Sequence, residues 1–257
     1  MTSDIPTRLL GGIRVIVATR AAFAQSMVDD WHRCQSAKGS WRPKLSFSAN
    51  GELLSRNARD PDLALLLDDA DTIDADGQPM VLFSRFWPGR PLPERIATTD
   101  FFHDAARAAE AAGMRFYLLG GTQAVAEKAA AEVHRLYPRL AIAGYRNGYF
   151  DESERDGVIA AIQAARPDVV WVGMGTPRQH VFSVYARDRL SGVTWIKTCG
   201  GLFDFIAGRH SRAPGWMQAA GLEWLYRLAL EPKRLLRRYL TTNFHALYLL
   251  FTRSERH

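Results

Sequence analysis

The sequence predicts an α/β fold: a Rossmann-like, mainly parallel sheet with helices on both faces, followed by a helical, basic C-terminal appendage. Three observations predict it. Short apolar, β-branched runs such as 169–172 and 193–196 are typical of strands buried on both faces. Such runs alternate with segments of helical spacing, which implies right-handed crossovers between parallel strands. From Ala213 onward the pattern is wholly helical.

The first half of the chain alternates strand-like and helical segments irregularly. Asp60 followed by Pro61 is a typical helix start, because the Asp side chain accepts a free amide and the proline needs no helical partner. Gly113 is a typical helix end. The expected strands are 13–18, 44–48 and 71–74, and the expected helices are 21–34, 52–57, 61–67, 79–86 and one from Thr99 or Asp100 to 112.

The second half alternates regularly. The expected strands are 115–119, 141–144, 169–172 and 193–197, and the expected helices are 124–137, 154–165 and one that Pro177 opens. We expect a boundary near residue 210, with an α/β core over 1–210 and a helical appendage over 211–257.

Length and composition are those of an ordinary globular protein with one sizeable core: 257 residues, 47% hydrophobic and 23% charged. Two cysteines make no disulfide framework, so we expect a reducing cytoplasm. We expect neither a signal peptide nor a transmembrane helix. Residues 227–257 hold seven basic and two acidic residues, which is +5 of the net charge of +6. This predicts an anionic partner, namely membrane lipid, diphosphate or nucleic acid; the alternative is a solvated helix face.

Three loops of small residues follow expected strands. In open parallel sheets ligands bind at such loops, and the free amides of helix N-termini suit a diphosphate. The alternative is that the glycines only form tight turns. The first loop lacks the full G-x-G-x-x-G, so it does not predict NAD. The loop residues are Gly120, Gly121 and Thr122; Gly173, Gly175 and Pro177; and Cys199, Gly200 and Gly201.

Several motifs in this chain occur together in one enzyme family. They are ADGQPMVLFSRFWPGRPLPERIATTD, GMGTPRQH and GGLFDFIAGRHSRAPGW with the helical run after it. From about residue 44 to 240 the chain resembles the WecG/TagA/CpsF glycosyltransferases (glycosyltransferase family 26). The resemblance implies transfer of a sugar from a UDP-sugar to a lipid-diphosphate-linked sugar at the inner face of the bacterial membrane. Such enzymes make cell-surface polysaccharides, including exopolysaccharide and wall-polymer linkers.

Asp76 is the candidate general base. It follows an expected strand in a glycine-flanked loop, where a carboxylate can face a cleft and take a proton. The alternative is a turn-forming Asp in an Asp-Gly pair. The family's Asp-Gly carboxylate matches Asp76-Gly77, so the resemblance implies a base in an inverting, single-displacement transfer. Composition does not separate Asp76 from its neighbours Asp68, Asp69, Asp71 and Asp74.

Other candidates come from the resemblance. Ser48 and Asn50 stand where the family has Thr-Pro-Asn, and they are implied to bind the donor sugar or the acceptor. Gln179 matches the glutamine of the family's G-x-P-[KR]-Q-E motif and is implied to contact the reacting sugar. Arg178 is a phosphate candidate. His180 replaces the family's Glu, which leaves the donor sugar open and makes His180 a candidate acid or base. Gly200, Gly201 and Asp204 match the segment beside the nucleotide site.

The sequence predicts a metal-independent transferase without a cofactor, because its seven histidines show no ligand spacing. Arginines or helix dipoles must then neutralise the diphosphate. Three of these arginines have helical spacing beside an apolar stripe, typical of an interfacial helix; the rival interpretation is packing on the protein's own core or on a second subunit. The arginines are Arg212, Arg227, Arg234, Arg237 and Arg238.

Two further function classes remain open. The chain could be a non-catalytic nucleotide-binding module that docks on a membrane or partner, and then UDP would bind without turnover. Nucleic-acid binding through the basic tail is the third hypothesis, although no known nucleic-acid motif supports it. The expected location is the cytoplasmic side of the plasma membrane, as a peripheral protein, and a homo-oligomer is left open.

Overall fold

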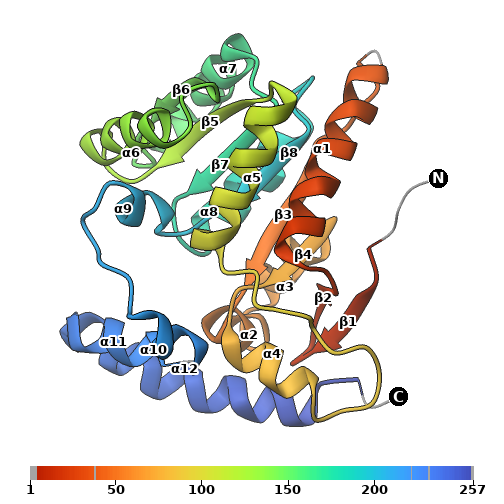
Figure 1. Ribbon diagram of the computed structural model, residues 1–257, viewed down its shortest axis with the longest axis vertical. Helices are drawn as coiled ribbons and strands as arrows, with labels where there is room; N and C mark the ends of the chain where they lie inside the picture. The colour runs from red at the N-terminus through yellow and green to blue at the C-terminus, as the bar shows by residue number, and fades with distance from the viewer. Residues whose placement is uncertain (1–4, 38, 221, 231, 256–257) are drawn as a thin grey trace.

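The computed structural model describes residues 5–37, 39–220, 222–230 and 232–255. Six strands form one parallel sheet in the order β4-β3-β8-β7-β5-β6 (Figure 1). This confirms the predicted α/β class with a parallel sheet. The strands are β3 (Lys44–Ala49), β4 (Thr72–Ala75), β5 (Arg115–Gly120), β6 (Ala141–Arg146), β7 (Val169–Gly173) and β8 (Trp195–Thr198).

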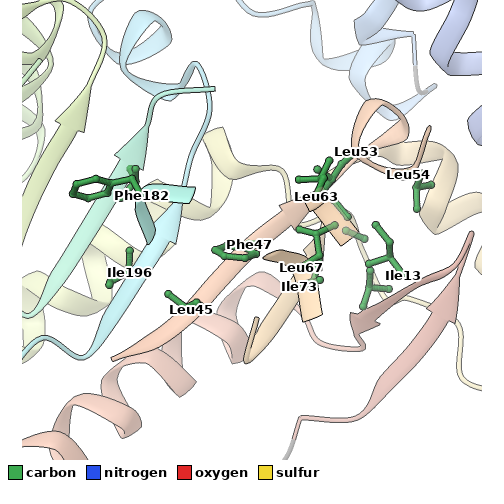
Figure 2. Packing of buried hydrophobic residues seen from close by; sticks show 14 of the residues in the cluster. Ile13, Leu45, Phe47, Leu53, Leu54, Leu63, Leu67, Ile73, Phe182 and Ile196 are labelled. Carbon is green, nitrogen blue, oxygen red and sulfur yellow. The ribbon is translucent and has the colours of Figure 1, made fainter. Parts of the chain in front are cut away.

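Helices cover both faces of the sheet and enclose two hydrophobic clusters. Figure 2 shows the first cluster, in which Phe47 and Ile196 of the sheet lie near Phe182 of α8. That face carries α2 (Gly51–Asn57), α3 (Pro61–Asp68), α4 (Gln78–Ser84), α7 (Arg155–Ala165) and α8 (Arg178–Arg187), with a 3-10 turn at Glu152–Glu154. The opposite face carries α1 (Arg20–Ser36), α5 (Thr98–Ala112), α6 (Gln123–Leu136) and α9 (Leu202–Ile206).

The strand expected at 13–18 does not join the parallel sheet. It forms β2 (Ile13–Ile16), which pairs antiparallel with β1 (Thr7–Leu10), a strand that the sequence analysis did not foresee. The two are joined by Gly11 and Gly12, whose φ values of 60° and 87° are those that a two-residue hairpin turn requires. The Gly12 amide donates to the Arg253 carbonyl at 2.8 Å, so the hairpin also contacts the end of the chain.

Three helices end the chain: α10 (Gly215–Ala219), α11 (Glu223–Leu230) and α12 (Pro232–Thr252). They lie at the end of the molecule that holds α2 and α4 (Figure 1). One face of α12 packs on α2 and α4. There Ser55 is hydrogen-bonded to His245 Nδ1 at 2.9 Å, and the rings of Phe83 and Phe251 meet edge to face at 4.6 Å. Within the described ranges, no helix is both long and apolar enough to cross a bilayer.

Candidate active site

The chain connections divide between the two faces of the sheet at the carboxyl ends of the strands. The helices that follow β5 and β7 lie on opposite faces of the sheet, and so do those that follow the neighbouring strands β3 and β8. Where the connections after neighbouring strands run to opposite faces of the sheet, open α/β sheets bind their ligands. All candidate residues from 48 to 204 lie at the last residues of strands, on the loops that follow them or in the helices that come next.

Glycines allow three of these loops to approach each other backbone to backbone. A Cβ added to Gly120 would lie 2.3 Å from the carbonyl oxygen of Gly173, and one added to Gly173 would lie 2.8 Å from that of Gly200. No real side chain fits at such distances, so packing alone requires glycine at Gly120 and Gly173. Gly173 and Gly200 are therefore neighbours across the sheet.

Other loop glycines face open space. An added Cβ at Gly175, Gly200 or Gly201 would meet no atom within 4 Å, which leaves room for a ligand. Gly121 packs against Val125, and Thr122 Oγ1 accepts a hydrogen bond from the Val125 amide at 3.3 Å, capping α6. The nucleotide role of this loop stays a prediction.

Gln179 and Arg178 open α8, and each is bound to another loop. The buried Gln179 accepts a hydrogen bond at Oε1 from the Gly200 amide at 3.1 Å. Arg178 donates to the carbonyls of Gly148 and Phe150 at 3.2 and 3.4 Å. Gln179 thus links the loop after β7 to the loop after β8, whereas Arg178 fixes the loop at 148–150.

His180 lies inside the core, with no exposed surface. Its ring meets Phe47 edge to face at 4.8 Å. Within the described chain, neither ring nitrogen has a hydrogen-bond partner. Burial, helped by the nearby Arg56 cation, lowers the pKa of His180 to about 4. The ring is therefore neutral near pH 7, and no surface of it reaches a ligand in this conformation.

Asp76 lies where the loops after β3 and β4 run side by side. Its amide donates to the Ala49 carbonyl at 2.8 Å, and a Cβ on Gly77 would lie 3.5 Å from the Cα of Asn50. Asn50 itself is exposed and caps α2 by accepting from the Leu53 amide at 3.1 Å. The register of the parallel strands therefore brings Asp76 and Asn50 together.

The Asp76 carboxylate lies in surroundings that raise its pKa. Its Oδ1 accepts a hydrogen bond from the Thr98 amide at 3.3 Å, in the first turn of α5. The pKa of Asp76 is raised to about 6, mainly by burial and also by the negative charges of Asp74 and Glu223, against the opposing effect of the Arg95 cation. A pKa close to the working pH is the requirement for an efficient general base.

Arg95 and Glu223 are site residues that the sequence analysis missed. Arg95 Nη1 lies 2.8 Å from Glu223 Oε2, and Arg95 Nη2 lies 3.8 Å from Asp100. Arg212 also pairs with Asp100, and its Nη2 lies 4.0 Å from Glu223. Two arginines thus stand beside Asp76, held by carboxylates. Arg95 is part of the motif PERIATTD, and this motif could have identified it as a candidate from the sequence.

The remaining candidates are Asp204 and the C-terminal arginines. Asp204, at the start of α9, pairs with Arg209 at 3.4 Å. The side chains of Arg227, Arg234, Arg237 and Arg238 lie outside the described part of the structure.

The metal-independent prediction also assumed that the sequence has no D-x-D motif, but Asp74-Ala75-Asp76 has that spacing. Asp74 is fully buried and paired with Lys197, whose Nζ lies 2.6 Å away. No group of three or more His, Cys, Asp or Glu side chains among the described residues could hold a metal ion.

Comparison with known proteins shows the family to which the chain belongs. The model of the Glycosyl transferase WecG/TagA/CpsF family matches residues 9–257. An N-acetylglucosaminyldiphosphoundecaprenol N-acetyl-beta-D-mannosaminyltransferase from Bacillus subtilis (strain 168) is 34% identical over 187 residues, which cover 73% of this chain and 72% of that protein. The protein of the same name from Bacillus spizizenii is 33% identical over 187 residues, or 73% and 71% of the two chains. The chain therefore belongs to the WecG/TagA/CpsF family of glycosyl transferases.

Proposed function

We propose that this protein is an inverting glycosyltransferase that moves a sugar from a UDP-sugar to a polyprenyl-diphosphate-linked glycan in bacterial surface polysaccharide synthesis. The observation that carries the proposal is Asp76. It is a carboxylate with a raised pKa of about 6, at the carboxyl end of a parallel sheet, with two arginines beside it. That combination suits the removal of a hydroxyl proton and the stabilisation of a departing diphosphate.

In this mechanism the acceptor hydroxyl gives its proton to Asp76. The acceptor oxygen attacks the anomeric carbon, and the bond from that carbon to the diphosphate oxygen breaks on the opposite face. The electron pair of that bond leaves with UDP, and the configuration at the anomeric carbon inverts. Negative charge therefore moves from Asp76 to the diphosphate during the step.

Arg95 and Arg212 are the cations that we assign to this charge. Both are largely buried, with side chains 13% and 27% exposed, so their attraction for a diphosphate is less screened than at a free surface. In the structure their partners are Glu223 and Asp100. A diphosphate could replace one carboxylate without leaving either arginine unpaired. The open backbone at Gly175, Gly200 and Gly201 is where we place the nucleotide.

The two Bacillus relatives indicate the class of substrate. Their names specify an N-acetylmannosaminyl group and an undecaprenol-diphosphate-linked N-acetylglucosamine acceptor. We propose an acceptor of the same class, namely a sugar on a polyprenyl diphosphate. For the donor we propose a UDP-linked hexose, N-acetylhexosamine or uronic acid, since His180, beside Gln179 in α8, replaces the Glu of the family motif.

The segment 211–257 is the proposed membrane-contacting appendage. The face of α12 opposite its packed side exposes Leu240, Phe244 and Tyr248, with 57%, 69% and 61% of their surface accessible. A continuous apolar face of this kind, on a basic helix, suits the headgroup zone of an anionic bilayer. It would hold the active site at the inner face of the membrane, where a lipid-linked acceptor is found.

Release of UDP by the purified protein tests the proposal. A panel of UDP-sugars is offered with a short-chain lipid-diphosphate sugar as acceptor, with and without EDTA, and Asp76→Asn is the control. We expect release that needs the acceptor, one preferred donor, insensitivity to EDTA, and a loss of roughly 10²–10⁴-fold in Asp76→Asn. UDP binding by calorimetry without turnover across several acceptors would favour the non-catalytic nucleotide-binding module instead.

A further inference from the structure

A fully buried ammonium group lies directly behind the proposed active site. Lys197 of β8 has no exposed surface, and its Nζ donates to Asp74 Oδ1 at 2.6 Å and to Ser48 Oγ at 2.7 Å. Asp74 is also fully buried. The three side chains come from adjacent strands β4, β3 and β8, and Ser48 is the register partner of Asp74.

Stability alone does not account for this ion pair. Both charges lose their hydration when they are buried, and replacing such a pair by apolar residues is often neutral or stabilising. The second oxygen of Asp74 has no hydrogen-bond partner within the described chain, so the pair is also incompletely satisfied. Burial raises the pKa of Asp74, and the Lys197 cation opposes that shift.

The pair controls the direction of one hydroxyl group. Ser48 Oγ receives a hydrogen bond from Lys197 Nζ and a second, at 3.1 Å, from the Thr98 hydroxyl. A hydroxyl oxygen has two lone pairs, so both acceptor positions of Ser48 are occupied. Its own proton is donated to Asp74 Oδ1 in the longest of the three bonds, at 3.3 Å. Ser48 is half-buried, so an acceptor oxygen of a ligand that reaches it can take this proton in place of Asp74.

We infer that Lys197, together with Asp74, is a positioning residue that fixes Ser48 as a hydrogen-bond donor to a substrate oxygen. This inference rests on the proposed transferase function. A hydroxyl that accepts from an ammonium group is polarised and becomes a stronger donor. The partner that fits is an oxygen that accepts hydrogen bonds, such as an amide carbonyl, a carboxylate or a phosphate oxygen.

The same network reaches Asp76. Thr98 donates its hydroxyl to Ser48 and its backbone amide to Asp76 Oδ1. One residue therefore ties the hydroxyl donor, which Lys197 holds, to the candidate base.

A mutant cycle tests the inference. Ser48→Ala is introduced into the wild type and into Asp74→Asn/Lys197→Met, which removes both charges together so that neither is left unpaired in the core. In the wild type, Ser48→Ala is expected to lower kcat/KM roughly 10- to 100-fold, as for loss of a charge-assisted hydrogen bond. In the neutral-pair background the same change is expected to cost less than about threefold. Asp30→Asn/Lys44→Met is the matched control, because that pair, at 2.9 Å, lies at the other end of the sheet.

Two outcomes overturn the inference: wild-type kcat/KM in the neutral-pair variant, or the same cost of Ser48→Ala in both backgrounds. If the wild type transfers no sugar, the proposed function fails. The cycle is then measured on the dissociation constant for UDP-N-acetylglucosamine. If Ser48→Ala raises that dissociation constant equally in both backgrounds, or if the wild type does not bind that nucleotide sugar, the positioning role is overturned as well.

Discussion

Gln179, in the first turn of α8, accepts a hydrogen bond from the backbone amide of Gly200, 3.1 Å away in the loop after β8. This bond joins two loops that follow neighbouring strands, at the point where both meet the proposed nucleotide site. Because Gln179 is buried, loss of its side chain would leave the Gly200 amide unsatisfied.

The first prediction concerns this bond. Gln179→Ala is expected to raise KM for the donor about tenfold, because the freed loop must be ordered again when the nucleotide binds. Gln179→Glu keeps an acceptor atom and should restore the loop position, seen as hydrogen-exchange protection at 199–202. Gln163→Ala is the matched control, since Gln163 makes a similar side-chain link to Ser191 at the other end of the sheet. Equal KM changes in Gln163→Ala and Gln179→Ala would contradict the prediction.

The second prediction is the pH dependence of the reaction. The base must be ionised, and the pKa of Asp76 is raised to about 6, so kcat/KM should rise with pH below about 6 and level off above it. The negative charge of Glu223 contributes to that increase in pKa. Glu223→Gln should therefore move the acid limb to lower pH, measured by steady-state rates from pH 4.5 to 8.5.

Glu152→Gln, which removes an exposed carboxylate 89% accessible in the 3-10 turn, should leave the acid limb where it is. An acid limb that does not move in Glu223→Gln, in folded protein, would show that another group sets it.

The third prediction separates function from stability at Asp76. The folded-state pKa of about 6 lies above the ordinary Asp value of 3.8, so the folded protein holds the proton more tightly than the unfolded chain does. Stability is therefore lost as pH rises from about 4 to 6. Asp76→Asn removes the charge and should raise the melting temperature at pH 8, while near pH 4 it should change little. A lower melting temperature of Asp76→Asn at pH 8 would refute this account.

The fourth prediction concerns membrane binding. Truncation after about Gly221 is a poor test, because Leu235, Leu249 and Leu250 of α12 are buried in the fold and their loss would damage it. A triple change of Leu240, Phe244 and Tyr248 to Ser alters only exposed surface. It should weaken co-sedimentation with anionic vesicles by roughly 1,000-fold, given about 1.5 kcal/mol for each of the three buried apolar side chains.

Leu136→Gln, on α6, is the control for that experiment, because Leu136 is 41% exposed and lies away from the appendage. Unchanged sedimentation of the triple variant, together with a smaller particle by light scattering, would assign the α12 face to a second copy of the chain.

The sequence alone determined the α/β class and most of its elements. The runs at 169–172 and 193–197 are local signals, because a buried strand must be apolar throughout whatever its neighbours are. The capping residue Asp60 is a local signal too, since its partner lies three residues away. The motif that contains Asp76 was identifiable because it is contiguous in the sequence.

Only the tertiary structure decided what lies around that carboxylate. Lys197 stands in an apolar strand and carries no local sign of function. Its partners Ser48 and Asp74 are 149 and 123 residues away in the sequence. The contacts form because β8 pairs with β3. Arg95 and Glu223 are 128 residues apart and meet because α11 docks beside the loop before α5. Strand order and helix docking arise from burial summed over the whole core, so no single segment contains that information.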